Sequence, residues 1–114
     1  MEINENLAIE SILEGYKKIN SDVFTLTRIL LLIFISYFKD GLQFRESKNA
    51  LNISDGKLIS NINKLNRMGY IKKEKITLDN KKLDIYLICE KGRKELKKIK
   101  KFTKNINQII SDEV

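Results

Sequence analysis

The pattern of hydrophobic and polar positions in residues 54–68 predicts a short helix with a defined start and end. Leu58, Ile62 and Leu65 are spaced by four and three residues, so they share one face of the helix. Ser54 is a suitable N-cap because its hydroxyl can accept a hydrogen bond from the first turn, and Gly69 is typical of the residue that follows a helix. We expect the opposite face to be polar and cationic, with Lys57, Ser60, Asn61, Lys64 and Arg67.

This polar face has two interpretations. Its amides and hydroxyl can pair with base edges, and its cations can hold phosphates. A solvated face of an ordinary helix has a similar composition. The helix by itself therefore does not decide between nucleic-acid binding and simple exposure.

The amino-terminal part of the chain predicts two further helices. In residues 2–20 one face carries the apolar positions Ile9, Ile12, Leu13, Tyr16 and Ile19. Residues 23–38 are apolar nearly all round, and we expect residues 21–22 to end the first helix and cap the second. A helix with so little polar surface must be covered on two sides. We expect the domain core on one side and a second subunit on the other.

The remaining segments predict a short strand, a short helix, a hairpin and a long helix. Residues 42–44 can form a stub of strand, and residues 45–51 a short helix that about three residues join to the helix at 54–68, which is helix-turn-helix spacing. Residues 70–78 and 83–88 predict a hairpin with a polar, basic tip at 79–82. Residues 90–111 predict a long helix with an apolar stripe of near-heptad spacing, made of Leu96, Ile99, Phe102, Ile106 and Ile109.

Length and charge narrow the class of partner. A chain of 114 residues suits one domain, and its net charge of +7 favours an anionic partner, nucleic acid first and a membrane surface second. Heavy use of Ile, Lys and Asn throughout also raises the charge without any function. The most apolar run, residues 23–38, is interrupted by Arg28 and is shorter than the ~20 residues that cross a bilayer. With one cysteine and no cationic, apolar leader, we expect a cytoplasmic protein.

The residue types that catalysis needs are largely missing. The chain has no histidine, the commonest general base and metal ligand, and its five glycines are scattered rather than gathered in a phosphate loop. A single cysteine without histidine makes neither a zinc site nor a Cys/His nucleophile. We therefore expect no catalytic residues, no metal and no cofactor, and a binding function.

The order of helices followed by a hairpin and a long helix is that of a winged helix-turn-helix, in a mainly α (α+β) chain with a two-stranded wing. The sequence also resembles the small archaeal and bacterial winged-helix transcriptional regulators related to the MarR and ArsR groups. The resemblance covers roughly residues 25–97 and rests on Leu42, Phe44, Ala50, Leu51, Ile53, Ser54, Asp55, Gly56, Leu58, Leu65, Gly69, Tyr70, Ile71, Tyr86, Glu90, Gly92, Arg93 and Leu96.

The resemblance implies sequence-specific binding of double-stranded DNA by a homodimer. The helix at 54–68 would enter the major groove and the wing at 76–84 would lie on the backbone or minor groove. Candidate DNA contacts are Arg45, Ser54, Asp55, Gly56, Lys57, Ser60, Asn61, Lys64, Asn80, Lys81 and Lys82, with Asn61 the expected base reader. Candidate dimer contacts are Ile9, Leu13, Tyr16, Ile99, Phe102, Ile106 and Ile109.

From the length of the chain we expect a single domain over residues 1–114. Residues 1–21 and 90–114 would be dimer helices around a winged-helix core at 22–89. A small-molecule effector, if the protein has one, leaves no motif in the sequence.

Two departures and two alternatives accompany this prediction. Ser47 stands where the family usually has leucine, and Cys89 stands where the last helix usually has a threonine cap. Cys89 is either an unreactive packed thiol or, beside Lys91 and Arg93, a redox-sensitive one.

The main alternative function is a winged-helix module that holds a protein or RNA partner. The lysines of residues 91–104 also suggest a membrane-surface helix, although a dimer seam explains the regular stripe better.

Overall fold

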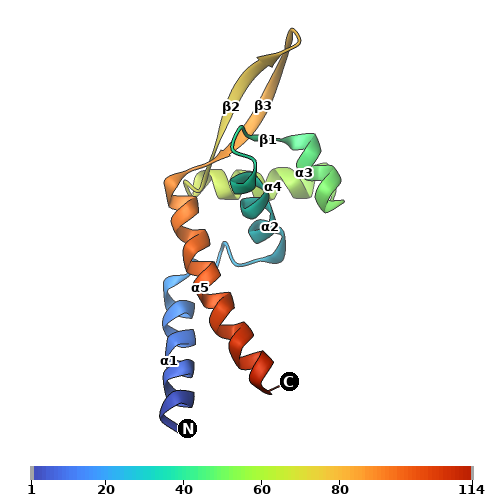
Figure 1. The fold of residues 1–114 in the computed structure, drawn as a ribbon. Helices are drawn as coiled ribbons and strands as arrows, with labels where there is room; N and C mark the ends of the chain where they lie inside the picture. The colour runs from blue at the N-terminus through green and yellow to red at the C-terminus, as the bar shows by residue number, and fades with distance from the viewer. Residues whose placement is uncertain (1, 114) are drawn as a thin grey trace.

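The computed structural model describes the backbone of residues 2–113 and the side chains of residues 7–111 (Figure 1). The fold is mainly α with a small antiparallel sheet, as predicted. In chain order, the elements are α1 (Glu2–Lys18), α2 (Leu26–Tyr37), β1 (Leu42–Gln43), α3 (Phe44–Leu51), α4 (Asp55–Arg67), β2 (Ile71–Leu78), β3 (Lys81–Ile88) and α5 (Glu90–Glu113).

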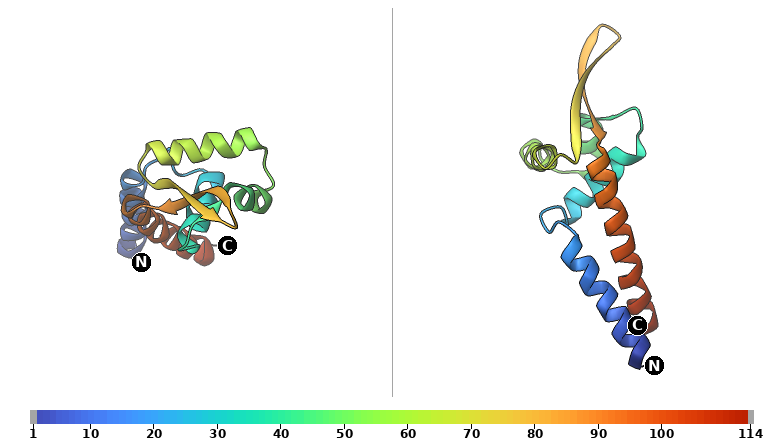
Figure 2. Two further views of the ribbon diagram at one scale, coloured as in Figure 1. Left: turned by 90° about the horizontal axis from the view of Figure 1, so that it is seen from above. Right: turned by 90° about the vertical axis from the view of Figure 1, so that its left-hand side faces the viewer.

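The molecule is elongated because its two ends leave the central domain together. Helices α1 and α5 pack side by side as an arm on one side, and the β2–β3 hairpin projects on the other (Figures 1 and 2). The principal extents are 63 × 26 × 22 Å. The radius of gyration is 17.1 Å, whereas a compact domain of this length has about 13 Å. The arm therefore carries much surface that the domain itself does not cover.

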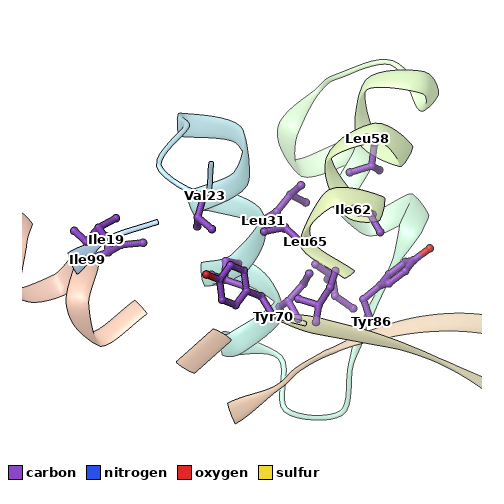
Figure 3. Packing of buried hydrophobic residues seen from close by; sticks show 13 residues of the cluster. Ile19, Val23, Leu31, Leu58, Ile62, Leu65, Tyr70, Tyr86 and Ile99 are labelled. Carbon is purple, nitrogen blue, oxygen red and sulfur yellow. The ribbon is translucent and has the colours of Figure 1, made fainter. Parts of the chain in front are cut away.

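The core lies between α2, α4 and the root of the sheet (Figure 3). Leu31, Leu32 and Ile35 of α2 meet Leu58 and Leu65 of α4, all almost fully buried. The predicted apolar stripe of α4 is thus the face that packs on the domain. At the base of the arm the core continues through Ile19, Val23 and Ile99.

The hairpin turn is tighter than we expected. The strand order is β1-β3-β2, and the short strand stub is confirmed for Leu42 and Gln43, which pair with β3, whereas Phe44 begins α3 instead. Only Asp79 and Asn80 form the turn, with φ of 52° and 64°, which is the conformation of a two-residue type I′ turn. The prediction of a four-residue tip was wrong, because Asp and Asn tolerate left-handed backbone and let Lys81 and Lys82 join β3.

Most helix ends follow the predicted signals, with one correction. The Ser54 hydroxyl accepts a hydrogen bond from the Lys57 N–H at 3.2 Å, and Gly69 has φ of +78° after α4. The prediction that residues 21–22 cap α2 was wrong. Thr25 caps this helix, since its hydroxyl accepts a bond from the Arg28 N–H at 3.3 Å. The linker between α1 and α2 is therefore longer than predicted.

The two departures from the family pattern are accommodated locally. Ser47 is 1% exposed, and its hydroxyl donates to the Gln43 carbonyl at 3.2 Å. The half-buried Cys89 holds its place by backbone bonds: its N–H donates to the Tyr70 carbonyl at 2.9 Å, and its carbonyl accepts from Arg93 N–H at 3.1 Å. Within residues 2–113 no helix combines the length and apolar character that a membrane crossing requires.

Candidate nucleic-acid interface

Helices α3 and α4 form the predicted helix-turn-helix. Asn52 ends α3 in left-handed conformation, with φ of 53°, and its N–H donates to the Lys48 carbonyl at 2.8 Å. Two residues later Ser54 caps α4. In the right view of Figure 2, α4 is seen end-on and stands out from the rest of the domain. This helix therefore offers one long face to a partner.

The outward face of α4 centres on four exposed residues at helical spacing: Gly56, Ser60, Asn63 and Arg67. Exposed Lys57 and half-buried Lys64 flank this row. We call these six residues the α4 face. It presents a hydroxyl, an amide and three cations, and the Cβ position of Gly56 has open space around it.

Asn61 does not belong to the α4 face, so its predicted exposure was wrong. It is 9% exposed, and its Oδ1 accepts from Arg28 Nε at 3.0 Å while its Nδ2 donates to the Lys57 carbonyl at 2.8 Å. The physical reason is its position three residues after Leu58 and four before Leu65, which turns it toward the core. By the same helical spacing, Asn63, which is not among the predicted contacts, is the exposed amide of the α4 face.

Several other candidates take part in bonds within the protein. Asp55 pairs with Lys48 across the helix-turn-helix, with Nζ and Oδ1 2.6 Å apart. Lys64 Nζ lies 3.9 Å from Asp22 Oδ1, and the Ser54 hydroxyl accepts the N-cap hydrogen bond of α4. These contacts fix the start and the flank of α4. The exposed row at the centre of the α4 face takes part in none of these contacts.

The wing carries its cations at the far end of the hairpin. Near the root, Lys73 pairs with Asp84 at 4.0 Å and Lys72 with Glu74 at 3.0 Å. Lys81 and Lys82 are exposed and pair with no carboxylate among the side chains of residues 7–111. Asn80 is exposed in the turn itself, and Arg45 is exposed on α3. The predicted contacts are thus split between α4, α3 and the wing tip.

The candidate dimer residues divide into two groups. Ile9, Leu13 and Tyr16 are 53%, 50% and 69% exposed, whereas Ile12 of α1 is half-buried and Ile19, which follows α1, is buried. By contrast, Ile99 is 5% exposed within its own protomer, so its placement on a free surface was wrong. The other three candidates on α5 are half-buried: Phe102, which packs edge-on against Phe24 at 5.6 Å between ring centroids, and Ile106 and Ile109.

Solved structures share this fold. MepR, a transcription regulator of the Staphylococcus aureus multidrug efflux pump MepA, is 14% identical with a TM-score of 0.71, over 98% of this chain and 82% of that one. A transcriptional regulator homologue from Pyrococcus horikoshii OT3 is 21% identical with a TM-score of 0.67, over 90% and 96%. Streptococcus pneumoniae FabT, solved in complex with DNA, is 19% identical with a TM-score of 0.65, over 98% and 76%. The predicted resemblance to MarR-type regulators is confirmed at the level of the fold.

Sequence comparison identifies the family. No protein of curated function matches the chain. A family model described as a winged helix DNA-binding domain matches residues 27–107, which run from α2 through the helix-turn-helix and the wing into α5. The chain belongs to the family of winged helix DNA-binding domains.

Proposed function

We propose that this protein is a transcriptional regulator that binds specific double-stranded DNA as a homodimer. The α4 face enters the major groove, and the wing, residues 76–84, lies on the backbone or minor groove. The observation that carries the proposal is the composition of the α4 face, a hydroxyl, an amide and cations on a helix that stands out from the domain. These groups suit base edges and phosphates.

The alternative function, a module for a protein or RNA partner, fits the surface less well. A protein-binding helix exposes apolar or aromatic anchors at the centre of its contact. On α4 the only partly exposed aliphatic side chain beside the polar row is Ile59, which is 48% exposed. The fold shared with FabT, which was solved with DNA, also supports DNA as the partner.

The homodimer is supported by two apolar stripes that the protomer leaves open. One is Ile9, Leu13 and Tyr16 on α1. The other runs along α2 through the exposed residues Leu26, Ile33 and Tyr37. Stripes of this kind on a small elongated chain are typical of subunit contacts. We propose that residues 1–21 and 90–114 supply the dimer helices and residues 22–89 the winged-helix core.

Replacing Asn63 by alanine should change sequence preference. An amide can pair with adenine in two places, and such a pair is worth about 1–3 kcal/mol of discrimination. Binding of Asn63→Ala to single-base variants of the preferred site should show reduced selectivity at one position per half-site. Loss of affinity equal at every position would contradict this role.

Asn61→Ala is the matched control, because it removes the same amide two residues away. It should leave base preference intact and lower the free energy of unfolding by about 1–3 kcal/mol, since the half-buried Arg28 loses the acceptor of its Nε. Denaturant unfolding and the same binding series distinguish the two variants.

Removing the charge of Lys81 should weaken binding to all sequences alike. A phosphate contact adds affinity through counterion release, so Lys81→Ala should reduce the slope of log K against log salt by about one unit. The control is Lys104→Ala, which removes the same charge from the arm. Equal effects of the two variants on the salt slope would contradict a phosphate contact at the wing tip.

A further inference from the structure

A buried carboxylate lies where the arm meets the winged helix. Glu95 of α5 is 4% exposed. Its Oε2 accepts a hydrogen bond from the Asn20 backbone N–H at 3.0 Å, and its Oε1 accepts one from the Tyr70 hydroxyl at 3.3 Å. Lys98 Nζ lies 3.8 Å from Oε1. A buried charge is costly unless such partners satisfy it, so these bonds hold Glu95 in one geometry.

The partners of Glu95 come from segments far apart in the chain. Asn20 follows α1, Tyr70 lies between α4 and β2, and Glu95 belongs to α5. The Asn20 side chain closes the network, because its Nδ2 donates to the Tyr70 hydroxyl at 3.1 Å. The same amide also reaches Met68 Sδ, at the end of α4, at 3.7 Å. We call Asn20, Tyr70 and Glu95 the junction.

A second contact ties the same linker to the middle of α4. The Arg28 guanidinium donates to the Asp22 carbonyl and to Asn61 Oδ1. Arg28 of α2 therefore bridges this linker to the centre of α4, and Asn20 joins the linker to the end of α4. Burial, opposed by the bond from Asn20, raises the pKa of Tyr70, so its hydroxyl remains a donor at any physiological pH.

We propose that Glu95 is a positioning residue that, through Tyr70 and Asn20, fixes α4 relative to the arm and so sets the spacing between the two DNA half-sites. The inference rests on the proposed homodimer. In a two-fold dimer the arms hold the two protomers together, and the separation of the two reading helices determines the half-site spacing. A loosened junction lets each α4 move relative to its arm, so the dimer accepts several spacings.

The test uses Tyr70→Phe in the full chain. This variant keeps the buried ring and removes only the hydroxyl that bonds Asn20 and Glu95. The matched control is Tyr86→Phe, in the same core, whose hydroxyl makes no hydrogen bond with the side chains of residues 7–111 or their backbone. Affinity is measured for duplexes that carry the preferred half-sites with the native spacer, one base pair fewer and one base pair more.

We expect Tyr70→Phe to bind the native spacing about tenfold more weakly. Its affinity for the altered spacings should change little, so that discrimination between spacings collapses while base preference within a half-site persists. Glu95→Gln, which replaces a double acceptor by an amide, should act in the same direction. Tyr86→Phe should keep the discrimination of the unmutated protein. Affinities are corrected for the active fraction by titration at stoichiometric DNA.

Two results separate the possible failures. If Tyr70→Phe and Glu95→Gln lose affinity equally at all spacings, or lose none, the junction is only structural and this inference is overturned while the proposed function stands. If the unmutated protein itself shows no preferred half-site, the proposed function fails, and the inference fails with it.

Discussion

Leu13→Glu should convert the protein to a monomer and lower its affinity for the preferred DNA site by about 10²- to 10⁴-fold. Leu13 lies in the middle of the exposed α1 stripe with Ile9 and Tyr16 and is 50% exposed in the protomer. A carboxylate buried in the proposed interface would lack a partner there. Loss of the dimer unlinks the two protomers, so each half-site must be bound by an independent protomer. Sedimentation at micromolar concentration and DNA titration measure the two effects.

Ser11→Glu is the matched control for this substitution. It adds the same charge to an exposed position of α1, but on a different face of the helix from Ile9, Leu13 and Tyr16. It should remain a dimer with unchanged DNA affinity. A dimeric Leu13→Glu protein, or an unmutated protein that is monomeric at this concentration, would contradict the proposed interface.

Gly92→Ala should lower the free energy of unfolding by about 3 kcal/mol. A Cβ atom at this buried glycine would lie 2.4 Å from the Tyr70 carbonyl oxygen and 3.0 Å from Ile88 Cγ1. The carbonyl cannot simply move aside, because it also accepts the Cys89 N–H bond at 2.9 Å. The start of α5 must shift away from the sheet root. Denaturant unfolding at a fixed protomer concentration measures the loss.

Gly56→Ala provides the comparison for stability. Gly56 also lies in a helix, but a Cβ there would meet nothing within 4 Å. Alanine should therefore stabilise the protein by up to about 1 kcal/mol, through its higher helix propensity. If both glycine variants had the same stability, the close packing between Gly92 and Tyr70 would not be a constraint.

The helix-turn-helix and wing were predictable because their signals are local. The Ser54 cap, the period of Leu58, Ile62 and Leu65, and Gly69 define α4 without any tertiary information. The prediction failed where the residue type did not indicate which face of the helix a side chain occupies. Asn61 is polar, yet it occupies a core-facing position because Arg28, 33 residues earlier in the sequence, supplies a partner for its amide. Its type suggested exposure, and only its helical spacing indicated burial.

The arm was predicted as two helices, but its inner and outer faces were not. Which apolar residues of α1 meet α5 depends on how the helices rotate about their axes. In the structure Ile12 is half-buried, whereas Ile9 and Leu13 on the same helix are exposed. Likewise, Ile99 belongs to the same stripe as Ile106 but is covered by its own protomer. The junction had no local signal, since its three residues are brought together only by the fold.

The most direct test of the central claim is selection of bound duplexes from a random DNA pool by the full chain, followed by determination of the stoichiometry on the selected site. We expect an inverted repeat bound by two protomers, with the selected bases lost in Asn63→Ala and kept in Asn61→Ala. Selection of no common sequence, or of a single unrepeated site bound by one protomer, would contradict a homodimer that reads DNA through α4.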